Sequence, residues 1–376
     1  MVRMDLATLP TPAALLDAAR LDHNIAAMQA RARALGVRLR PHVKTTKSWP
    51  VVRRQLAAGA AGITVSTLKE AEQFAAQGVR DILYAVGIVP AKLAAVRALR
   101  EGGCRLTVIL DSVEAAEALV AHGREHGHGF DVMIEIDTDG HRAGLAPDAP
   151  ALPAVARVLA EGGANLVGVM THCGASYACR GEAELAAMAE QERARCVAAA
   201  QLLRAAGHAC PEVSVGSTPT ATFARHLDGV TELRAGVYAF HDLVMRGLGV
   251  CATGDIALSV LTTVIGHQRD KGWVLVDAGW MAMSRDRGQD DCGYGVVCSE
   301  AGEPLPGLLM TGANQEHGIV SRADGTADTT LAERLPVGTR LRVLPNHACA
   351  TAAQFDRYAV LADGTVADTW PRFNGW

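Results

Sequence analysis

The chain has 376 residues, of which 49% are hydrophobic and 20% are charged, and its formal net charge is −4 at pH 7. This length exceeds one average domain, and the composition is that of a globular chain with a large core rather than of a disordered or fibrous one. The mild negative charge, with arginines spread along the chain, excludes the basic patch that nucleic-acid or membrane-surface binding requires.

The N-terminal stretch MVRMDLATLPTPAALLD has no apolar run of signal-peptide length, so we expect no secretory signal. No stretch approaches the roughly 20 apolar residues of a membrane span. The nine cysteines have no framework spacing, and we expect them to be free thiols in a reducing, cytoplasmic compartment.

Apolar runs rich in β-forming residues alternate with segments of helical periodicity, such as LKEAEQFAAQG, in the first two thirds of the chain. This alternation predicts parallel βαβ units, and eight of them fit a (β/α)8 TIM barrel. A doubly wound sheet is the alternative, but the Gly-rich dinucleotide turn typical of that fold does not follow the first strand. The eight predicted strands are 37–43, 62–67, 81–86, 106–111, 131–137, 166–173, 212–218 and 231–240.

The pattern changes near Cys251, after which short alternating strands and Gly-rich turns dominate. We therefore predict an α/β barrel followed by an all-β domain. The extended, proline-containing stretch LPTPAALLD is expected to pair with the β domain rather than with the barrel. The predicted segments are 1–20 (extended N-terminal segment), 21–250 (barrel) and 251–376 (β domain).

In a barrel of this kind, catalytic groups collect at the C-terminal ends of the strands. A lysine at such a position is most simply a solvated charge. Together with a Gly-Ser-Thr turn, which is suited to holding phosphate through backbone N–H groups and hydroxyls, it predicts a phosphorylated aldehyde cofactor, pyridoxal 5′-phosphate. The strand-end residues that we single out are Lys44, Arg142, His172, Tyr177, Gly216, Ser217, Thr218, Gly236 and Tyr238.

A second candidate site is the stretch PNHACATA, where His347 and Cys349 are predicted to alternate on a strand and to share one face. Imidazole and thiolate are ligands that zinc prefers, although a His-x-Cys pair alone is a weak signal. Two protein ligands leave positions open for water and substrate, as in a catalytic site.

The motifs RPHVKTTKS, SVGSTPT, ELRAGVYAF and LPNHACATA resemble those of the fold-type III pyridoxal-phosphate enzymes, and among them the D-serine dehydratase and D-threonine aldolase group. The resemblance runs from TPAALLD to the terminal FNGW and implies a barrel of the alanine-racemase type. It implies that Lys44 forms the Schiff base, that Arg142 lies near the phenolic oxygen of the cofactor and Tyr177 near its pyridine nitrogen. His172 is expected either to stack on the ring or hold Arg142, or to be an ordinary core residue. The resemblance further implies zinc, or manganese or cobalt, at His347 and Cys349.

The reaction implied by the resemblance is dehydration of a D-3-hydroxy amino acid to a 2-oxo acid and ammonia. Lys44 removes the Cα proton, and the metal activates the β-hydroxyl as a leaving group. Aldolases of the group tend to carry His-x-Asp at the metal pair, so Cys349 favours a dehydratase. Retro-aldol cleavage, a non-catalytic pyridoxal-phosphate protein and a racemase are the alternatives. Two-domain enzymes of this fold type imply a homodimer.

The stretch WMAMSRDRGQ (280–289) carries Arg285 and Arg287 on either side of one aspartate. A solvated turn is the simplest interpretation. Alternatively, the two guanidinium groups bind a second substrate carboxylate, which predicts D-threo-3-hydroxyaspartate first and D-serine second as substrates. Gln315, in TGANQEHG (311–318), is a further candidate substrate residue.

Overall fold

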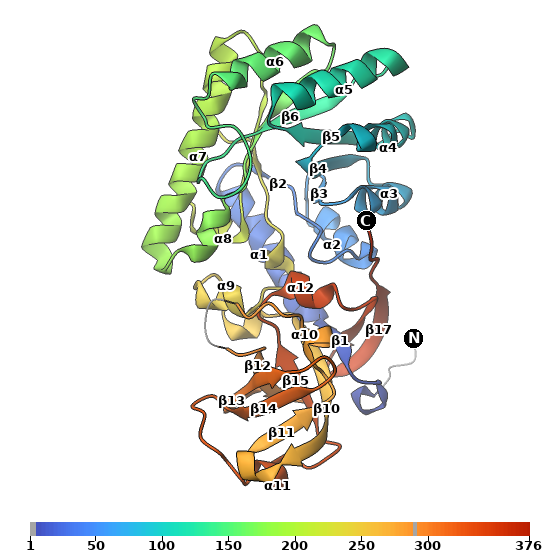
Figure 1. Cartoon of the computed structure of the whole chain (residues 1–376), viewed down its shortest axis with the longest axis vertical. Helices are drawn as coiled ribbons and strands as arrows, with labels where there is room; N and C mark the ends of the chain where they lie inside the picture. The colour runs from blue at the N-terminus through green and yellow to red at the C-terminus, as the bar shows by residue number, and fades with distance from the viewer. Residues whose placement is uncertain (1–4, 289–291) are drawn as a thin grey trace. The chain divides into compact units, whose positions relative to one another are not determined.

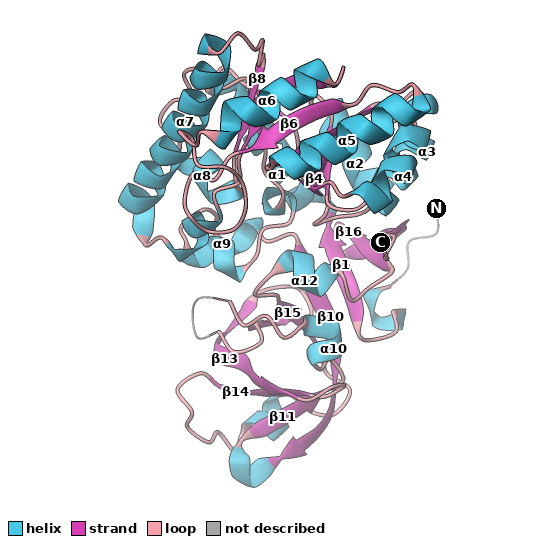
Figure 2. Cartoon of the chain, turned by 45° about the horizontal axis from the view of Figure 1, so that its top comes forward, coloured by secondary structure: helices cyan, strands magenta, loops and turns pink. Residues whose placement is uncertain are grey.

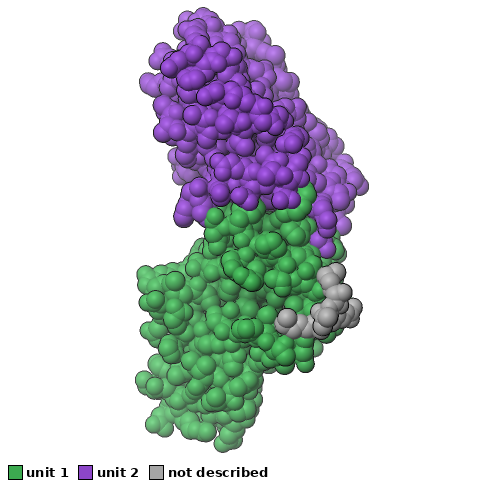
Figure 3. Space-filling view, turned by 90° about the vertical axis from the view of Figure 1, so that its right-hand side faces the viewer, with its two compact units in different colours: residues 1–25, 45–51, 237–374 green, residues 26–44, 52–236, 375–376 purple. Residues whose placement is uncertain are grey.

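The computed structural model describes residues 5–288 and 292–376. The chain divides into two compact units (Figure 3). The first unit takes residues 1–25, 45–51 and 237–374, as far as they are described, and the second takes 26–44, 52–236 and 375–376. The predicted domain boundaries, after residues 20 and 250, remain predictions.

The second unit is built on eight parallel strands. Its two edge strands meet at an isolated parallel bridge between His42 and Thr64. There the N–H of Val43 donates to the carbonyl oxygen of Thr64 at 2.9 Å. The sheet therefore closes, and the predicted (β/α)8 barrel is confirmed. In sheet order the strands are β2 (Arg38–Leu39), β9 (Glu232–Leu233), β8 (Glu212–Val215), β7 (Asn165–Met170), β6 (Asp131–Glu135), β5 (Arg105–Leu110), β4 (Asp81–Gly87) and β3 (Ile63–Val65).

Helices follow most of these strands, and α4, α5 and α6 lie outside β5 and β6 (Figures 1 and 2). Hydroxyl side chains directly after a strand start several of them: Thr67 accepts from the N–H of Glu70, and Ser112 from that of Ala115. Such caps satisfy backbone donors of the first turn, so short strand-to-helix connections are enough. The helices are α1 (Ala18–Ala34), α2 (Trp49–Ala57), α3 (Leu68–Ala76), α4 (Pro90–Glu101), α5 (Val113–His126), α6 (Ala151–Glu161), α7 (Gly181–Ala205) and α8 (Thr218–Phe223).

The last barrel strand is much shorter than the predicted 231–240. It ends at Leu233, and a 3₁₀ turn, η3 (Val237–Ala239), follows. The carbonyl oxygen of Val237 accepts from the N–H groups of Phe240 and His241, which bends the chain away from an extended path.

The first unit contains an antiparallel barrel. Its nine-stranded sheet includes β10, which pairs with both β11 and β15, so the six strands β10 to β15 close on themselves. The N-terminal strand β1 pairs with β10 and, in parallel, with β16. In sheet order the strands are β11 (Trp273–Val276), β14 (Gly318–Arg322), β13 (Pro304–Ala313), β12 (Val296–Ser299), β15 (Arg340–Leu344), β10 (Leu258–Gln268), β1 (Ala13–Asp17), β16 (Arg357–Ala362) and β17 (Thr365–Pro371).

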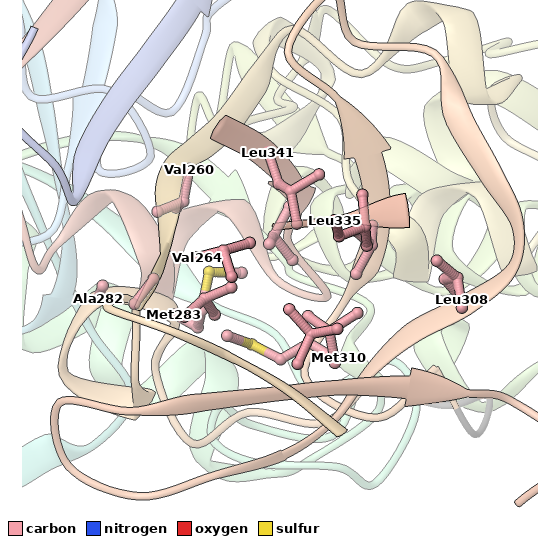
Figure 4. Packing of buried hydrophobic residues seen from close by; sticks show 14 of the residues in the cluster. Val260, Val264, Ala282, Met283, Leu308, Met310, Leu335 and Leu341 are labelled. Carbon is pink, nitrogen blue, oxygen red and sulfur yellow. The ribbon is translucent and has the colours of Figure 1, made fainter. Parts of the chain in front are cut away.

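The core of this unit is aliphatic (Figure 4). Val260, Val264, Met283, Met310 and Leu341 pack together inside the antiparallel barrel. Val260 and Val264 come from β10, Leu341 from β15 and Met310 from β13, whereas Met283 comes from a short helix. Short helices connect the strands: α9 (Leu243–Gly247), α10 (Trp280–Met283), α11 (Leu331–Arg334) and α12 (Ala348–Ala352). No helix of residues 5–288 and 292–376 has both the length and the apolarity of a membrane span.

Candidate active site

Lys44 lies just beyond β2, in the turn that follows the His42 bridge, and its side chain is exposed. Burial, together with the charge of Lys44, lowers the pKa of two neighbouring histidines. Burial lowers the pKa of His172 to about 3, with the positive charges of Lys44 and then Arg142 adding to the effect. Burial and Lys44 likewise lower the pKa of His42 well below its usual value. Both imidazoles are therefore neutral near pH 7.

His42 carries an unpaired polar atom. Its Nε2 lies 3.4 Å from Ser66 Oγ, but its buried Nδ1 has no hydrogen-bond partner within the part of the chain that the structure describes. A buried ring nitrogen without a partner costs free energy, so this position fits a bound polar group or water beside the lysine.

Arg142 comes from the loop after β6, as predicted, and is half exposed. Its Nη2 lies 3.4 Å from Glu135 Oε1. Burial raises the pKa of Glu135, and the Arg142 charge partly offsets this. Tyr177 lies in the 3₁₀ turn η2 (Gly174–Ala178), whose Ser176 Oγ is 3.0 Å from Ser217 Oγ. The ends of β7 and β8 are thus joined through hydroxyl groups.

A buried carboxylate on α7 also joins these two strand ends. Glu192 Oε1 accepts from the N–H of Cys173 at 3.1 Å and from the N–H of Gly216 at 2.9 Å. Gly216 has φ +129°, and a Cβ there would collide with the Arg234 backbone, so only glycine fits. Glu192 therefore holds in place the Gly-Ser-Thr turn at residues 216–218, which the sequence predicts to bind phosphate.

The donors of this turn differ from the expectation. The N–H of Gly216 is bound by Glu192, and the N–H of Ser217 donates to Thr220 Oγ1 at 3.0 Å. Both N–H groups thus have acceptors within the protein, and the prediction that this turn holds phosphate remains a prediction. Hydroxyl groups here, and the backbone near Thr218 and Gly236, are the remaining candidates. Tyr238 lies in η3, belongs to the first unit and is only 1% exposed.

His347 and Cys349 do not alternate on a strand, so that prediction is wrong. Strand β15 ends at Leu344, His347 precedes α12, and Cys349 lies in the first turn of that helix. The helix starts here because Asp242 Oδ2 accepts from the N–H of Ala348 at 2.9 Å. The two side chains nevertheless meet, since a hydrogen bond joins them.

Two further groups contact the pair. Asp286 Oδ2 lies 2.7 Å from His347 Nδ1, and Thr45 Oγ1 lies 3.1 Å from Cys349 Sγ. Burial lowers the pKa of His347, but the hydrogen bonds to Asp286 and Cys349 outweigh it and raise the value to about 11. Asp286 and Cys349 thus stabilise positive charge at His347, and an imidazole beside a cysteine sulfur suits a borderline-soft cation.

No group of three or more His, Cys, Asp or Glu side chains placed to hold a metal occurs within residues 5–288 and 292–376. The pair that the sequence predicts as metal ligands, His347 and Cys349, is joined by a hydrogen bond. Two protein ligands would leave positions open for water or substrate, as in catalytic sites.

The two arginines beside Asp286 stack on aromatic rings. The Arg285 guanidinium lies 4.0 Å from the Trp280 ring centroid, and that of Arg287 lies 5.5 Å from the Tyr294 centroid. All three residues of this stretch, Arg285, Asp286 and Arg287, are exposed. Gln315 is exposed, and its carbonyl oxygen accepts from the N–H of Met281 at 3.1 Å. Gln289, at the end of the predicted stretch, lies outside the described residues.

Family models match both parts of the chain. Residues 16–243 match "Alanine racemase, N-terminal domain", and residues 257–361 match "Putative serine dehydratase domain". The chain belongs to the alanine-racemase-type family of fold-type III enzymes, in the group that carries the serine dehydratase domain, as the sequence motifs predict. The expected enzyme of the lyase type and the alanine-racemase type of barrel are confirmed.

Individual relatives show which enzymes of this group the chain is similar to. The chain is 62% identical over 377 residues to a D-threo-3-hydroxyaspartate dehydratase of Delftia sp. (strain HT23), which covers 99% of both chains. A solved D-threo-3-hydroxyaspartate dehydratase, a cysteine-to-alanine variant in the metal-free form, has a TM-score of 0.98 at 61% identity and covers 99% of this chain and 100% of its own. A D-threonine aldolase of Arthrobacter sp is 33% identical, covering 97% of this chain and 92% of its own.

Sequence reasoning missed four side chains that organise the site: His42, Glu192, Asp242 and Asp286. His42 lies inside the motif RPHVKTTKS, two positions before Lys44. Asp286 lies inside a stretch already singled out for its arginines. Glu192 gave no local signal, because its partners are distant in sequence. Asp242 caps α9 locally through the N–H of Met245, but its bond to Ala348 joins residues far apart in sequence.

Glu192 generates a stability prediction. Glu192→Ala leaves two buried N–H groups without an acceptor, and at roughly 1–3 kcal/mol each the free energy of unfolding should fall by about 2–6 kcal/mol in urea titrations. Glu192→Gln keeps an oxygen acceptor and should lose clearly less. The matched control is Glu190→Ala on the same helix, where an exposed pair with Arg193 is worth about 1 kcal/mol or less. Equal losses in the free energy of unfolding for the Ala and Gln variants would contradict the role of Glu192 as the acceptor that joins the ends of β7 and β8.

Proposed function

We propose that this chain is a pyridoxal-phosphate- and metal-dependent dehydratase that converts D-threo-3-hydroxyaspartate, and more slowly D-serine, to a 2-oxo acid and ammonia. The observation that carries the proposal is the contact between Thr45 Oγ1 and Cys349 Sγ at 3.1 Å. Because Thr45 directly follows Lys44 in the chain, the residue assigned to the cofactor is covalently tied to one that touches the metal pair. The 62% identity to a D-threo-3-hydroxyaspartate dehydratase supports the substrate.

The residues around Lys44 fit the cofactor. The lysine side chain is exposed, the Nδ1 of His42 is buried and unpaired among the described residues, and His172 is held neutral. A neutral, flat imidazole is suited to stacking on an aromatic ring. Lys44 would hold the cofactor covalently, Arg142 and Tyr177 would contact its ring substituents, and the segments near Gly216, Ser217, Thr218, Gly236 and Tyr238 would contact its phosphate.

The donor atoms of His347 and Cys349 fit zinc, with manganese and cobalt as alternatives. A D-threo-3-hydroxyaspartate dehydratase with a cysteine exchanged for alanine was solved in a metal-free form, which supports a metal in this family. When bound, pyridoxal 5′-phosphate supplies an electron sink for the carbanion at Cα, and the metal ion supplies a Lewis acid.

The protein groups then have defined tasks. The Lys44 amine takes the proton from Cα. His347 and Cys349 would hold the metal ion, which would supply a Lewis acid for the β-hydroxyl. Loss of the Cα proton and of the hydroxyl leaves an enamine, which hydrolyses to the 2-oxo acid and ammonia. A neutral His172 neither competes for the proton nor repels the charged lysine. We also propose a homodimer and a cytoplasmic location.

The direct test is a product analysis. With the cofactor and zinc supplied, D-threo-3-hydroxyaspartate and D-serine should each yield 2-oxo acid and ammonia in equal amounts, and a chelator should stop the reaction without releasing the cofactor. Glycine and an aldehyde as the main products would favour the alternative, retro-aldol cleavage, which the 33% identical D-threonine aldolase represents. Absence of turnover would favour a pyridoxal-phosphate-binding protein without catalysis.

Lys44→Ala should lower kcat below detection and remove the absorbance of the covalently held cofactor, because no other amine is assigned to it. Lys44→Arg should be equally inactive, since a guanidinium stays protonated and cannot act as a base. Lys47→Arg, three positions on, is the matched control and should remain active. Cofactor that borohydride still traps covalently in Lys44→Ala would refute the assignment.

The arginine pair generates a specificity prediction. Each charge-assisted contact with a second carboxylate contributes on the order of 1.5–3 kcal/mol, so Arg285→Met or Arg287→Met should lower kcat/KM for D-threo-3-hydroxyaspartate by roughly tenfold to a hundredfold. Values for D-serine should change little. Methionine keeps an apolar contact with the rings of Trp280 and Tyr294. Arg269→Met, an exposed arginine of the same unit, is the control. Equal losses on both substrates would dismiss the carboxylate contact.

A further inference from the structure

We infer that Asp286 is the residue that makes His347 a metal ligand, by binding its Nδ1–H and leaving Nε2 as the ligating nitrogen. The inference rests on the proposed function, because it needs the metal at His347 and Cys349. Asp286 Oδ2 lies 2.7 Å from His347 Nδ1, the distance of a strong charge-assisted hydrogen bond. A carboxylate in this position fixes the tautomer and ring orientation of a ligating histidine and raises its basicity.

The same geometry argues against Asp286 as a third ligand. Its Oδ2 is bonded to the ring nitrogen that faces away from any ion held by Nε2. Its Oδ1 accepts from the N–H of Gly288 at 3.3 Å. Both oxygens are thus used within the loop and on the histidine, which is the arrangement of a positioning residue.

The loop that presents Asp286 is shaped for this contact. Ser284 has φ +72°, a conformation that side chains rarely adopt, and its Oγ accepts from the N–H of Asp286 at 3.2 Å. Such local strain persists only where surrounding contacts impose it. Gly288, at φ +70°, closes the turn and packs against Asn346.

The loop and the start of α12 are also tied together directly. The Asn346 amide nitrogen donates to the carbonyl oxygen of Asp286 at 3.3 Å and to that of Gly293 at 2.9 Å. Thr351 Oγ1 donates to the carbonyl oxygen of Met283 at 2.8 Å. Contacts therefore flank His347 on both sides in sequence and hold it in register with Asp286.

The arginines on either side of Asp286 are turned to other partners. Arg285 stacks on Trp280 and Arg287 on Tyr294, whereas the ion pair of Asp286 is with His347 at 2.7 Å. Stacking keeps the two guanidinium groups engaged, so the carboxylate charge acts on the imidazole. This accounts for an acidic residue set between two basic ones.

The test is zinc affinity in the full-length, cofactor-loaded protein, measured by competition with a chromophoric chelator. Asp286→Ala should weaken zinc binding by about tenfold to a hundredfold, and Asp286→Asn, which keeps an oxygen acceptor without the charge, by less. Cofactor content and the absorbance of the bound cofactor should not change. At saturating zinc, the kcat of the Asp286 variants should return close to that of the parent protein, although their zinc affinity stays lower. Asp270→Asn, an exposed aspartate of the same unit, is the matched control.

The outcomes separate this inference from the proposed function. If Cys349→Ala and the parent protein take up the same amount of zinc, the metal site itself is wrong. If Cys349→Ala loses zinc while both Asp286 variants bind it as tightly as the parent, only the role of Asp286 is overturned. If the Asp286 variants lose cofactor as well as zinc, the residue supports the fold and the inference also fails.

Discussion

Closure of the parallel barrel at β2 is the constraint on which the cofactor site depends, because Lys44 follows this strand. The ladder of β2 is only two residues long, and its seam to β3 rests on the bridge between His42 and Thr64. Arg40 reinforces the seam from inside: its Nε donates to Glu232 at 2.7 Å and its Nη1 to Asp81 at 2.8 Å. A buried guanidinium is tolerated only when paired, so these carboxylates lock the strand in place.

The chain around β2 carries further polar groups. Arg38 and Arg40 line a cavity at the N-terminal ends of the strands, together with charged residues of other strands such as Asp81 and Arg105. His42 and Lys44 follow β2 toward the C-terminal ends. On β4 to β7 the residues Leu83, Ile109, Met133 and Met170 pack together as an apolar cluster.

The fold was predictable because the hydrophobic patterns of the parallel barrel and of the β domain are both local features of the sequence. Parallel strands buried on both faces give continuous apolar runs, and the β domain shows plain alternation. The lysine and the His-x-Cys pair could be found from motifs. The helical geometry of that pair could not, because the Ala348 N–H at the start of α12 is bound by Asp242, about a hundred positions earlier in the chain. The role of Glu192 could not be predicted from the sequence either. Its carboxylate accepts hydrogen bonds from the N–H groups of Cys173 and Gly216 only once α7 lies against the ends of β7 and β8.

The proposed metal ligand at position 349 also bears on the choice between elimination and retro-aldol cleavage. In either reaction the proposed metal ion would act on the β-hydroxyl, but cleavage of Cα–Cβ requires a base to take the hydroxyl proton, whereas elimination requires the hydroxyl to leave with its proton. A carboxylate beside the metal has spare oxygen lone pairs for that proton, while sulfur is a weak acceptor. Cys349 Sγ is already contacted by Thr45 Oγ1 and by His347. In the proposed site, Cys349 as a ligand would therefore supply no carboxylate oxygen as a base for the β-hydroxyl, which favours departure of the hydroxyl over its deprotonation.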